Sequence, residues 1–314
     1  MERRVFGPVP SLRLGKSLGV NNIPYKICTY SCIYCQVGKA IKMQINRQEF
    51  YNPDDLVDEA KALLSNIQDK KDYPDYITIV PDGEPTLDIN LGILIEKLKR
   101  LGVPVAVITN ASLIDRPEVQ NDLLKADYVS FKADIFSFEN WKKLNLPHKQ
   151  LNIHQIKDGI RVFRNYFSGK MVTETMLVKG VNDSTEELKN TARVIESFEP
   201  EAAYIAIPTR PPAFKKVEPP GEATVNEAYH VFKEYIENVE LLTGYEGNAF
   251  ASVGNFRDDL LSITAVHPMR EDAVLELLDK TDGNKNSIDA LLQENLVEKV
   301  QYSGHSYYLR KFIR

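Results

Sequence analysis

The chain lacks most of the residues from which extracellular frameworks and membrane spans are built. Among 314 residues there are three cysteines, five histidines and one tryptophan. Three cysteines cannot form the disulfide framework of a small secreted domain. No run of about 18 consecutive apolar residues occurs, so no transmembrane helix is predicted. The first residues also lack the apolar core of a signal peptide. These absences predict a cytoplasmic protein without membrane contact.

Neither sign of charge dominates the chain. Lysine and arginine total 39 against 44 aspartates and glutamates, which gives a formal net charge of −5 and a pI near 5.7. Hydrophobic residues make up 43% of the chain and can build a substantial core. These values are typical of an ordinary globular protein.

All three cysteines lie close together, as Cys28, Cys32 and Cys35. The spacing is Cys-x3-Cys-x2-Cys, with Tyr34 directly before the last cysteine. Three thiolates on one short segment can ligate three irons of a [4Fe–4S] cluster and leave the fourth iron open. An open iron is what a reactive cluster needs, so the motif predicts chemistry at the cluster.

A disulfide, a zinc site and plain burial compete with the cluster as the role of the cysteine motif. A disulfide would leave one thiol over, in a chain with no sign of export. A zinc site would need a fourth Cys or His nearby, whereas His148 and His154 lie far downstream. Free cysteines also pack as small hydrophobes, which does not account for every cysteine falling in one segment. The sequence therefore favours the cluster.

Strand-like and helix-like segments alternate along most of the chain. Apolar, β-branched runs predict strands at residues 76–80, 103–109, 128–131, 172–178 and 203–207. Helical periodicity predicts helices at residues 53–66, 91–101, 117–125, 151–165, 184–198 and 225–240. This alternation predicts an α/β fold with parallel strands and right-handed crossovers, in a barrel or in an open sheet.

The last 53 residues have a different pattern. Two short helices are predicted at 270–280 and 285–294, followed by strands at 296–300 and 306–309 around a Ser303-Gly304 turn. This outline predicts a small winged-helix-like module at residues 262–314. The main domain is then residues 1–261, including an extension that starts at about residue 211.

The cysteine spacing with Tyr34 resembles the signature of the radical S-adenosylmethionine (SAM) enzymes. The resemblance implies a partial (β/α)6 TIM-like barrel. It also implies that Cys28, Cys32 and Cys35 bind the [4Fe–4S] cluster and that Tyr34 lies against the adenine of SAM. In that family the reduced cluster cleaves SAM to a 5′-deoxyadenosyl radical, which abstracts a substrate hydrogen. An electron donor of the flavodoxin or ferredoxin type is implied as a partner.

Polar residues follow the predicted strands, where a barrel gathers its chemistry. The run Asp82-Gly83-Glu84 resembles the Gly-Gly-Glu element that grips the amine of SAM, with Asp82 replacing the first glycine. An ordinary Asp-Gly turn is the alternative. Thr109 and Asn110, which end the next strand, are expected to contact the cofactor.

The later strands supply the remaining candidates. Ser130 is expected to bind the cofactor near the substrate, and the backbone around Val178 and Gly180 resembles the stretch that pairs with adenine. Lys132, Asp134 and Arg210 are the candidate catalytic residues, with Arg210 as a clamp for an anionic group. Lys132 and Asp134 could instead pair with each other, because residues two apart on a strand share one face.

Local charge bears on possible partners. The first 40 residues hold six basic side chains and one acidic one, which favours an anionic substrate or an acidic electron donor. Residues 262–314 carry seven basic and eight acidic residues, a poor footprint for phosphates. One basic edge there would consist of Lys299, Arg310, Lys311 and Arg314. RNA therefore stays among the candidate substrates.

Several stretches, among them Phe6-Gly7-Pro8 and Lys179-Gly180-Val181-Asn182-Asp183, indicate a narrower group. They are similar to archaeal and bacterial Fe–S oxidoreductases grouped with the tRNA wyosine-base (4-demethylwyosine) synthases. Those synthases hold a second cluster on extra cysteines, and this chain has no further cysteine. A radical SAM enzyme that modifies RNA or protein is the favoured prediction. A wyosine-type enzyme and a winged-helix regulator that senses through its Fe–S centre are the alternatives.

Overall fold

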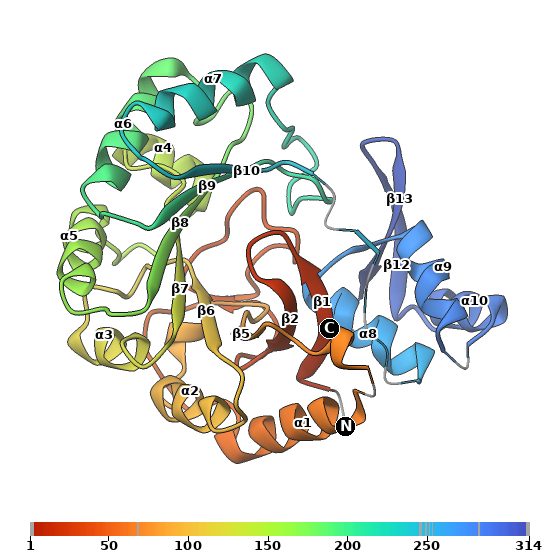
Figure 1. The fold of residues 1–314 in the computed structure, drawn as a ribbon. Helices are drawn as coiled ribbons and strands as arrows, with labels where there is room; N and C mark the ends of the chain where they lie inside the picture. The colour runs from red at the N-terminus through yellow and green to blue at the C-terminus, as the bar shows by residue number, and fades with distance from the viewer. Residues whose placement is uncertain are drawn as a thin grey trace.

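A curled, open sheet forms the body of the protein (Figure 1). The computed structural model describes residues 3–67, 69–244, 247–248, 250, 252, 254–281 and 283–311. Within these residues the sheet runs in the order β1 (Val5–Ser11), β2 (Gly15–Val20), β5 (Tyr76–Ile79), β6 (Val105–Thr109), β7 (Tyr128–Lys132), β8 (Lys170–Met176), β9 (Ala202–Ala206) and β10 (Val239–Leu242). Neighbours from β2 to β10 are parallel, and β1 is antiparallel to β2.

Helices join the parallel strands and cover the outer face of the sheet (Figure 1). They are α1 (Pro53–Asn66), α2 (Leu91–Lys99), α3 (Pro117–Leu123), α5 (Ile153–Arg164), α6 (Thr185–Glu196) and α7 (Glu222–Lys233), and α4 (Phe138–Asn145) precedes α5. In the described part of the chain, six strand–helix units thus follow one another from β2 to α7. The predicted partial (β/α)6 barrel is confirmed.

Local sequence signals explain where these helices begin. The Asn52 side chain accepts a hydrogen bond from the Asp54 N–H, with Pro53 in the first helical position of α1. Ser184 caps α6 in the same way by accepting from the Glu187 N–H. Both helix starts were predicted because a cap depends only on neighbouring residues.

Alternation along each strand separates the core from the site. Val129 and Phe131 of β7 face the helices, where Phe131 packs edge-to-face on Phe163 of α5 with ring centroids 5.4 Å apart. Tyr128 points to the opposite, concave face and packs with residues of other strands such as Tyr204. Ser130 and Lys132 share that concave face by the same alternation. The polar side chains of Ser130 and Lys132, near the carboxyl end of β7, therefore point into the barrel.

Two parts of the sheet differ from the sequence prediction. The hairpin of β1 and β2 and the helix α4 were not predicted. The single helix predicted at residues 225–240 is wrong at its end, because α7 stops at Lys233 and Val239 opens β10. β10 pairs in parallel with β9, with Val239 opposite Ala203. An apolar stripe fits either structure, and pairing with the β9 edge decides between them.

A smaller unit lies beside β1 (Figure 1). It consists of α8 (Phe256–Val266), β11 (Met269–Arg270), α9 (Glu271–Asp279), α10 (Lys285–Gln293), β12 (Val297–Tyr302) and β13 (His305–Arg310), with the strand order β11-β13-β12. The two predicted helices and the hairpin at Ser303-Gly304 are confirmed. We call these elements the C-terminal module. Its classification as a winged helix stays a prediction.

The predicted division between residues 261 and 262 falls inside α8. Phe256, Leu260 and Ile263 of α8 pack in one apolar cluster with the rest of the C-terminal module. We therefore propose that the module begins before α8, at about Asn255. The same cluster includes Phe6 and Val9 of β1, so the module shares its core with one edge of the barrel. Among the helices that the structure describes, none has both the length and the apolarity to cross a bilayer.

Candidate functional site

The three cysteines lie on the loop that leaves the carboxyl end of β2 and leads to α1, here called the cluster loop (residues 21–52). Cys28 belongs to a short strand, β3 (Ile27–Cys28), paired with β4 (Lys42–Met43). The Cys35 N–H donates to the Cys32 carbonyl over 3.1 Å, which turns the chain between the two thiols. All three are free thiols and partly exposed, so the disulfide alternative is wrong.

The end of α4 holds the cluster loop in place. The Ser31 N–H donates to the Asn145 carbonyl over 3.1 Å, and the Ile33 N–H donates to the Leu144 carbonyl over 2.9 Å. Leu146 ends this helix in the left-handed conformation, with φ of 42°. A helix that the sequence did not predict is therefore part of the site.

Each cysteine sulfur receives an N–H donor from a side chain. Lys26 Nζ lies 3.1 Å from Cys35 Sγ, and Asn145 Nδ2 lies 3.3 Å from Cys32 Sγ. Asn110 Nδ2 lies 3.7 Å from Cys28 Sγ. Hydrogen bonds to the sulfurs are one of the ways in which proteins tune iron–sulfur clusters. Lys26 and Asn145 were not predicted as site residues.

Burial raises the pKa of Cys28 to about 11 and the pKa of Cys32 to about 12. Burial thus favours the protonated form of the Cys28 and Cys32 thiols, and metal binding displaces these protons. Three thiols on one loop, each with an N–H donor, are a donor set that fits a [4Fe–4S] cluster. Within the described residues, no three His, Cys, Asp or Glu side chains are arranged so that they could hold a metal ion.

One histidine lies nearer to the cysteines than its sequence position indicates. The His148 N–H donates to the Thr29 carbonyl over 2.9 Å, so its backbone lies against the cluster loop. Its ring nitrogen Nδ1 accepts from the Gln150 N–H at 3.4 Å. This ring does not complete a three-residue metal site within the described residues, and the zinc alternative gains no support.

Glu84 connects two strand ends at the mouth of the barrel. Its carboxylate accepts hydrogen bonds from the Thr86 N–H at 3.1 Å, the Thr109 hydroxyl at 2.5 Å and the Asn110 N–H at 2.9 Å. Burial raises the pKa of Glu84, and these donors oppose the rise. The structure thus brings Glu84, Thr109 and Asn110 together. Glu84 also caps the short 3-10 turn Pro85–Leu87. A structural role in this turn is therefore compatible with the predicted contact to the cofactor.

Gly83 is where the barrel mouth meets the cluster loop. A Cβ atom on this residue would lie 1.9 Å from the carbonyl oxygen of Ile27, the neighbour of Cys28. The same carbonyl accepts from the Glu84 N–H at 3.2 Å. Glycine is required here because the two backbones approach too closely for any side chain.

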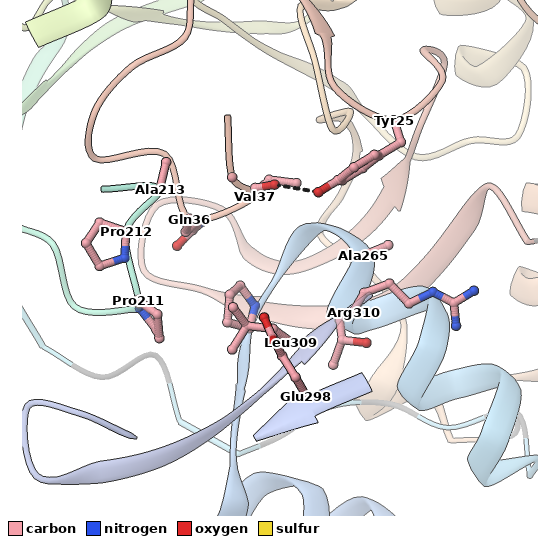
Figure 2. A pocket seen from close by; sticks show the side chains of 13 residues that line it. Tyr25, Gln36, Val37, Pro211, Pro212, Ala213, Ala265, Glu298, Leu309 and Arg310 are labelled. Carbon is pink, nitrogen blue, oxygen red and sulfur yellow. Dashed lines mark hydrogen bonds between the residues drawn. The ribbon is translucent and has the colours of Figure 1, made fainter. Parts of the chain in front are cut away.

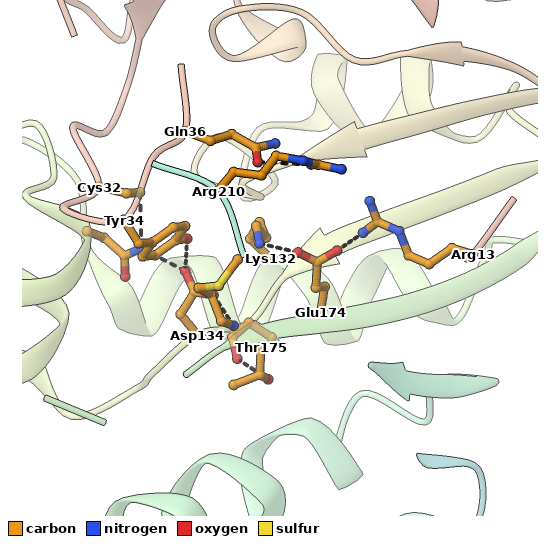
Figure 3. A network of polar contacts seen from close by, with 12 residues as sticks. Arg13, Cys32, Tyr34, Gln36, Lys132, Asp134, Glu174, Thr175 and Arg210 are labelled. Atoms are coloured by element: carbon orange, nitrogen blue, oxygen red, sulfur yellow. Dashed lines mark hydrogen bonds and ion pairs between the residues drawn. The ribbon is translucent and has the colours of Figure 1, made fainter. Parts of the chain in front are cut away.

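Asp134 joins the cluster loop to β8 (Figure 3). One carboxylate oxygen accepts from the Tyr34 hydroxyl and from Asn145 Nδ2, the latter at 2.8 Å. The other oxygen accepts from the Met176 N–H at 2.9 Å. Burial raises the pKa of Tyr34 well above its ordinary value, so its hydroxyl stays a donor to Asp134.

Lys132 does not pair with Asp134, so that alternative is wrong. β7 and β8 place Lys132 directly opposite Glu174, and the two side chains form an ion pair (Figure 3). Arg13, from the β1–β2 turn, contacts the other oxygen of Glu174. Burial lowers the pKa of Lys132. The partner on the next strand was not predicted because strand register cannot be obtained from one segment of sequence.

The remaining predicted cofactor residues lie in β7 and after β8. Ser130 is buried, and no hydrogen-bond partner of its hydroxyl is found among the described residues. The Val178 N–H donates to Asn182 Oδ1 at 2.8 Å, and the exposed Gly180 donates to Asp183 Oδ1 at 2.7 Å. Asn182 also donates to the Asp134 carbonyl, which ties this loop to the site.

Arg210 links the cluster loop to the C-terminal module. Its Nη1 donates to Gln36 Oε1 at 3.0 Å, and Gln36 directly follows Cys35 (Figure 3). Its Nη2 hydrogen-bonds to the His267 ring. Next to it, the hydroxyls of Tyr302 and Tyr307 donate to the carbonyls of residues 208 and 209, each at 2.9 Å. The predicted anion clamp is thus held at the junction of the two units.

A cavity of about 220 Å³ lies at this junction (Figure 2). The cluster loop contributes Gln36 and Val37, and the loop after β9 contributes Pro212. Ala265 and Glu298 line it from the C-terminal module. The Tyr25 hydroxyl braces one wall by donating to the Val37 carbonyl at 3.0 Å. The cavity therefore borders the residues next to Cys35.

Ion pairs engage several of the basic side chains in the N-terminal segment. Arg3 pairs with Asp259 at 3.1 Å, Arg4 pairs with Glu59 at 2.6 Å, and Lys16 pairs with Asp72 at 3.3 Å. Carboxylates from elsewhere in the chain thus neutralise these three charges, whereas Lys39 stays exposed. The docking of an anionic group there stays a prediction. In the predicted basic edge of the module, Lys299 pairs with Glu271, and Arg314 lies outside the described residues.

Comparison with known proteins agrees with the fold and with the donor set. A profile of the radical SAM superfamily matches residues 22–193, which include the cluster loop and the ends of β5 to β8. The chain belongs to the radical SAM superfamily. A UPF0026 protein from Methanocaldococcus jannaschii is 41% identical to it over 307 residues, 97% of this chain and 95% of that protein.

Two more distant similarities are informative. The S-adenosyl-L-methionine-dependent tRNA 4-demethylwyosine synthase of Pyrococcus abyssi is 25% identical over 178 residues, 51% of either protein. The crystal structure of Streptococcus suis SuiB bound to S-adenosylmethionine has the same fold with a TM-score of 0.53 and 14% identity, over 73% of this chain and 51% of that one. The predicted family and fold are confirmed, and the wyosine relationship is a distant one.

Membership has direct consequences for the chemistry. Radical SAM enzymes use a [4Fe–4S] cluster and SAM, so these are the cofactors of this chain. The protein is therefore an enzyme, and it needs a reductant to supply the electron. The identities of the substrate and of the reductant are separate questions.

Proposed function

We propose that the protein cleaves SAM reductively and uses the product to abstract a hydrogen atom from RNA or protein. The observation that carries this proposal is the set of three free thiols, each with its own N–H donor, beside the Glu84 carboxylate. When bound through Cys28, Cys32 and Cys35, the cluster supplies one electron to SAM, which yields methionine and a 5′-deoxyadenosyl radical. The protein contributes positioning and the exclusion of water.

In this proposal Glu84 binds the ammonium of SAM. Its Oε1 already accepts from Thr86 and Thr109, whereas Oε2 accepts from the Asn110 N–H. Oε2 can still accept one more donor, because a carboxylate offers about four lone-pair positions. Gly83 admits the close approach of this turn to the cluster loop. Thr109 and Asn110 contact Glu84 at the end of β6, and Ser130 lies on the concave face of β7.

Tyr34 and Asp134 act together as positioning residues. Asp134 fixes the Tyr34 hydroxyl, and a fixed ring offers a flat apolar face to the adenine. The backbone around Val178 and Gly180 borders the same region through the contact of Asn182 with Asp134. Asp134 is therefore assigned to positioning and not to proton transfer.

Lys132 and Arg210 face the substrate side. Lys132 lies on the concave face above the Tyr34 ring, with Nζ 5.3 Å from the ring centroid. Arg210 lies where the cluster loop meets the module, and its partner Gln36 and its neighbour Pro211 line the 220 Å³ cavity. We propose that the substrate approaches the cluster from this junction, with Arg210 contacting an anionic group.

The proposal is tested by the products of SAM. Anaerobically purified and reconstituted protein, reduced with dithionite, is expected to convert SAM to 5′-deoxyadenosine and methionine, as chromatography will show. The same protein without reductant is the control and should yield neither product. Intact SAM in the presence of a fully loaded, reduced cluster would contradict the proposal and favour the Fe–S-sensing regulator.

A prediction about Glu84 tests the cofactor site. Glu84→Gln is expected to weaken SAM binding by about one to two decades in affinity, because an uncharged acceptor replaces a charge-assisted hydrogen bond of roughly 1.5–3 kcal/mol. The iron content should stay at the wild-type level, since Glu84 contacts none of the three thiols. Calorimetric titration of the loaded protein with SAM measures the effect.

The matched control for Glu84→Gln is Glu187→Gln. Glu187 is also buried and accepts hydrogen bonds from Ser137 Oγ at 2.9 Å and Asn140 Nδ2 at 3.0 Å, in α6 on the outer side of the sheet. Its substitution should leave SAM affinity unchanged. Equal SAM affinities for Glu84→Gln and the wild type would mean that Glu84 only stabilises the turn that follows it.

A further inference from the structure

Lys26 is a buried lysine whose side chain is directed at a cluster ligand. Its exposed fraction is 3%, and Nζ lies 3.1 Å from Cys35 Sγ. The backbone is held in the left-handed region with φ of 55°, and the Lys26 carbonyl accepts from the N–H groups of Ile41 and Lys42 at 3.0 and 3.2 Å. This conformation is unfavourable for a residue with a side chain. The cluster loop nevertheless holds Lys26 in this conformation. The conformation brings the Lys26 ammonium to the Cys35 sulfur.

The charge of Lys26 distinguishes it from the other donors. Asn110 and Asn145, which contact Cys28 and Cys32, are neutral amides. No carboxylate forms an ion pair with Lys26 among the described residues. A buried cation without a counter-charge is costly. The thiolates of the loaded cluster loop are therefore the negative charges that compensate it.

We propose that Lys26 is a positioning residue that raises the reduction potential of the cluster through its contact with Cys35 Sγ. Reduction adds one negative charge to the cluster, and a cation close to a ligand sulfur stabilises the reduced state more than the oxidised one. The protein can then be reduced by a weaker one-electron donor. The inference rests on the proposed function only in that Cys35 ligates the cluster.

The test compares midpoint potentials of loaded proteins. Lys26→Met should lower the equilibrium constant for one-electron reduction at least tenfold, a negative shift of about 59 mV or more. Anaerobic potentiometric titration without SAM, followed by electron paramagnetic resonance, measures the potential. Lys26→Arg keeps the charge and should stay close to the wild type.

The matched control is Lys39→Met in the same loop. Lys39 is exposed, and its Nζ lies over the Phe214 ring at 4.2 Å from the centroid. This variant loses the same charge without losing a contact to sulfur, so its potential should equal that of the wild type. A shift as large as that of Lys26→Met would overturn the inference, because net charge alone would then account for it.

Iron and sulfide contents separate the possible failures. A wild-type protein that holds no cluster contradicts the proposed function itself. Loaded Lys26→Met with a wild-type potential overturns the role of Lys26 alone. If Lys26→Met loses its cluster, Lys26→Gln keeps an N–H donor without charge and should show the same negative shift. Loss of the cluster in both neutral variants, with retention in Lys26→Arg, would assign Lys26 to cluster assembly and overturn the tuning role.

Discussion

Each of the substitutions Cys28→Ala, Cys32→Ala and Cys35→Ala is expected to give a soluble protein without a [4Fe–4S] cluster, whereas the wild type should hold close to one cluster per chain. The reason is that the sequence has no fourth cysteine to replace a lost ligand. Two thiolates cannot hold a cluster that the wild type binds with three. Iron and sulfide analysis, visible absorption and magnetic resonance of anaerobically purified protein measure the loss.

Ser31→Ala is the matched control for the cysteine substitutions. Ser31 lies between Cys28 and Cys32, and its hydroxyl accepts from the Ala40 N–H at 3.1 Å. Removing this hydroxyl leaves all three thiols in place, so the cluster should be retained. Full iron occupancy in any single cysteine variant, or stoichiometric zinc in the wild type, would contradict the assignment of these ligands.

The features that could be predicted from the sequence depend on residues close together in the chain. Cys28, Cys32 and Cys35 are within one loop, and Glu84 follows the strand that presents it. A helix cap such as Ser184 needs only the next turn. Strand–helix alternation then predicts a parallel sheet, because parallel strands require crossovers. The resemblance to the radical SAM enzymes, and not the alternation, selects the partial barrel. Once these strands are aligned, their polar carboxyl ends must lie at one edge of the sheet.

The features that could not be predicted depend on contacts between distant segments. The partner of Lys132 is Glu174, which follows from the register of β7 against β8. β10 exists because residues 239–242 pair with β9, although their pattern also suits a helix. Asn145 reaches Cys32 only because α4 ends against the cluster loop. In each case the local sequence allows several structures and tertiary pairing selects one.

Lys26 is an intermediate case. It lies two residues before Cys28, so its proximity to the motif was visible in the sequence. The direction of its side chain was not visible in the sequence. That direction depends on a left-handed backbone in a residue other than glycine. Sequence patterns predict such a conformation poorly, since it is rare outside glycine and a few polar residues.

A truncation that ends at residue 261 is expected to be insoluble or to lack a cooperative unfolding transition. The sequence analysis divided the chain into a main domain of residues 1–261 and a module of residues 262–314. A cut at this division falls in the middle of α8 and removes one side of an apolar cluster. Phe6 and Val9 of β1 would lose their cover, as would Phe256 and Leu260 of the remaining half-helix.

The free energy lost on exposing these apolar side chains is large enough to prevent folding. Each large apolar side chain that becomes exposed costs roughly 1.5–3 kcal/mol, so four of them cost roughly 6–12 kcal/mol. The whole free energy of unfolding of a typical domain is only about 5–15 kcal/mol. β1 is also one of the two edge strands of the sheet, and an uncovered apolar edge promotes aggregation. Solubility, size-exclusion chromatography and thermal unfolding measure the outcome.

A truncation that ends at residue 311 is the control, because it keeps β13 and the whole apolar cluster, and it should remain soluble and unfold cooperatively. The shorter chain also loses His267, the partner of Arg210, and with it the link from the module to Gln36 beside Cys35. A soluble, monomeric chain of residues 1–261 that unfolds cooperatively and still cleaves SAM would contradict two arguments. One is that the barrel needs the shared apolar cluster, and the other is that Arg210 needs His267. The barrel would then be complete without the module, and Arg210 would not need His267 to stay beside the cluster loop.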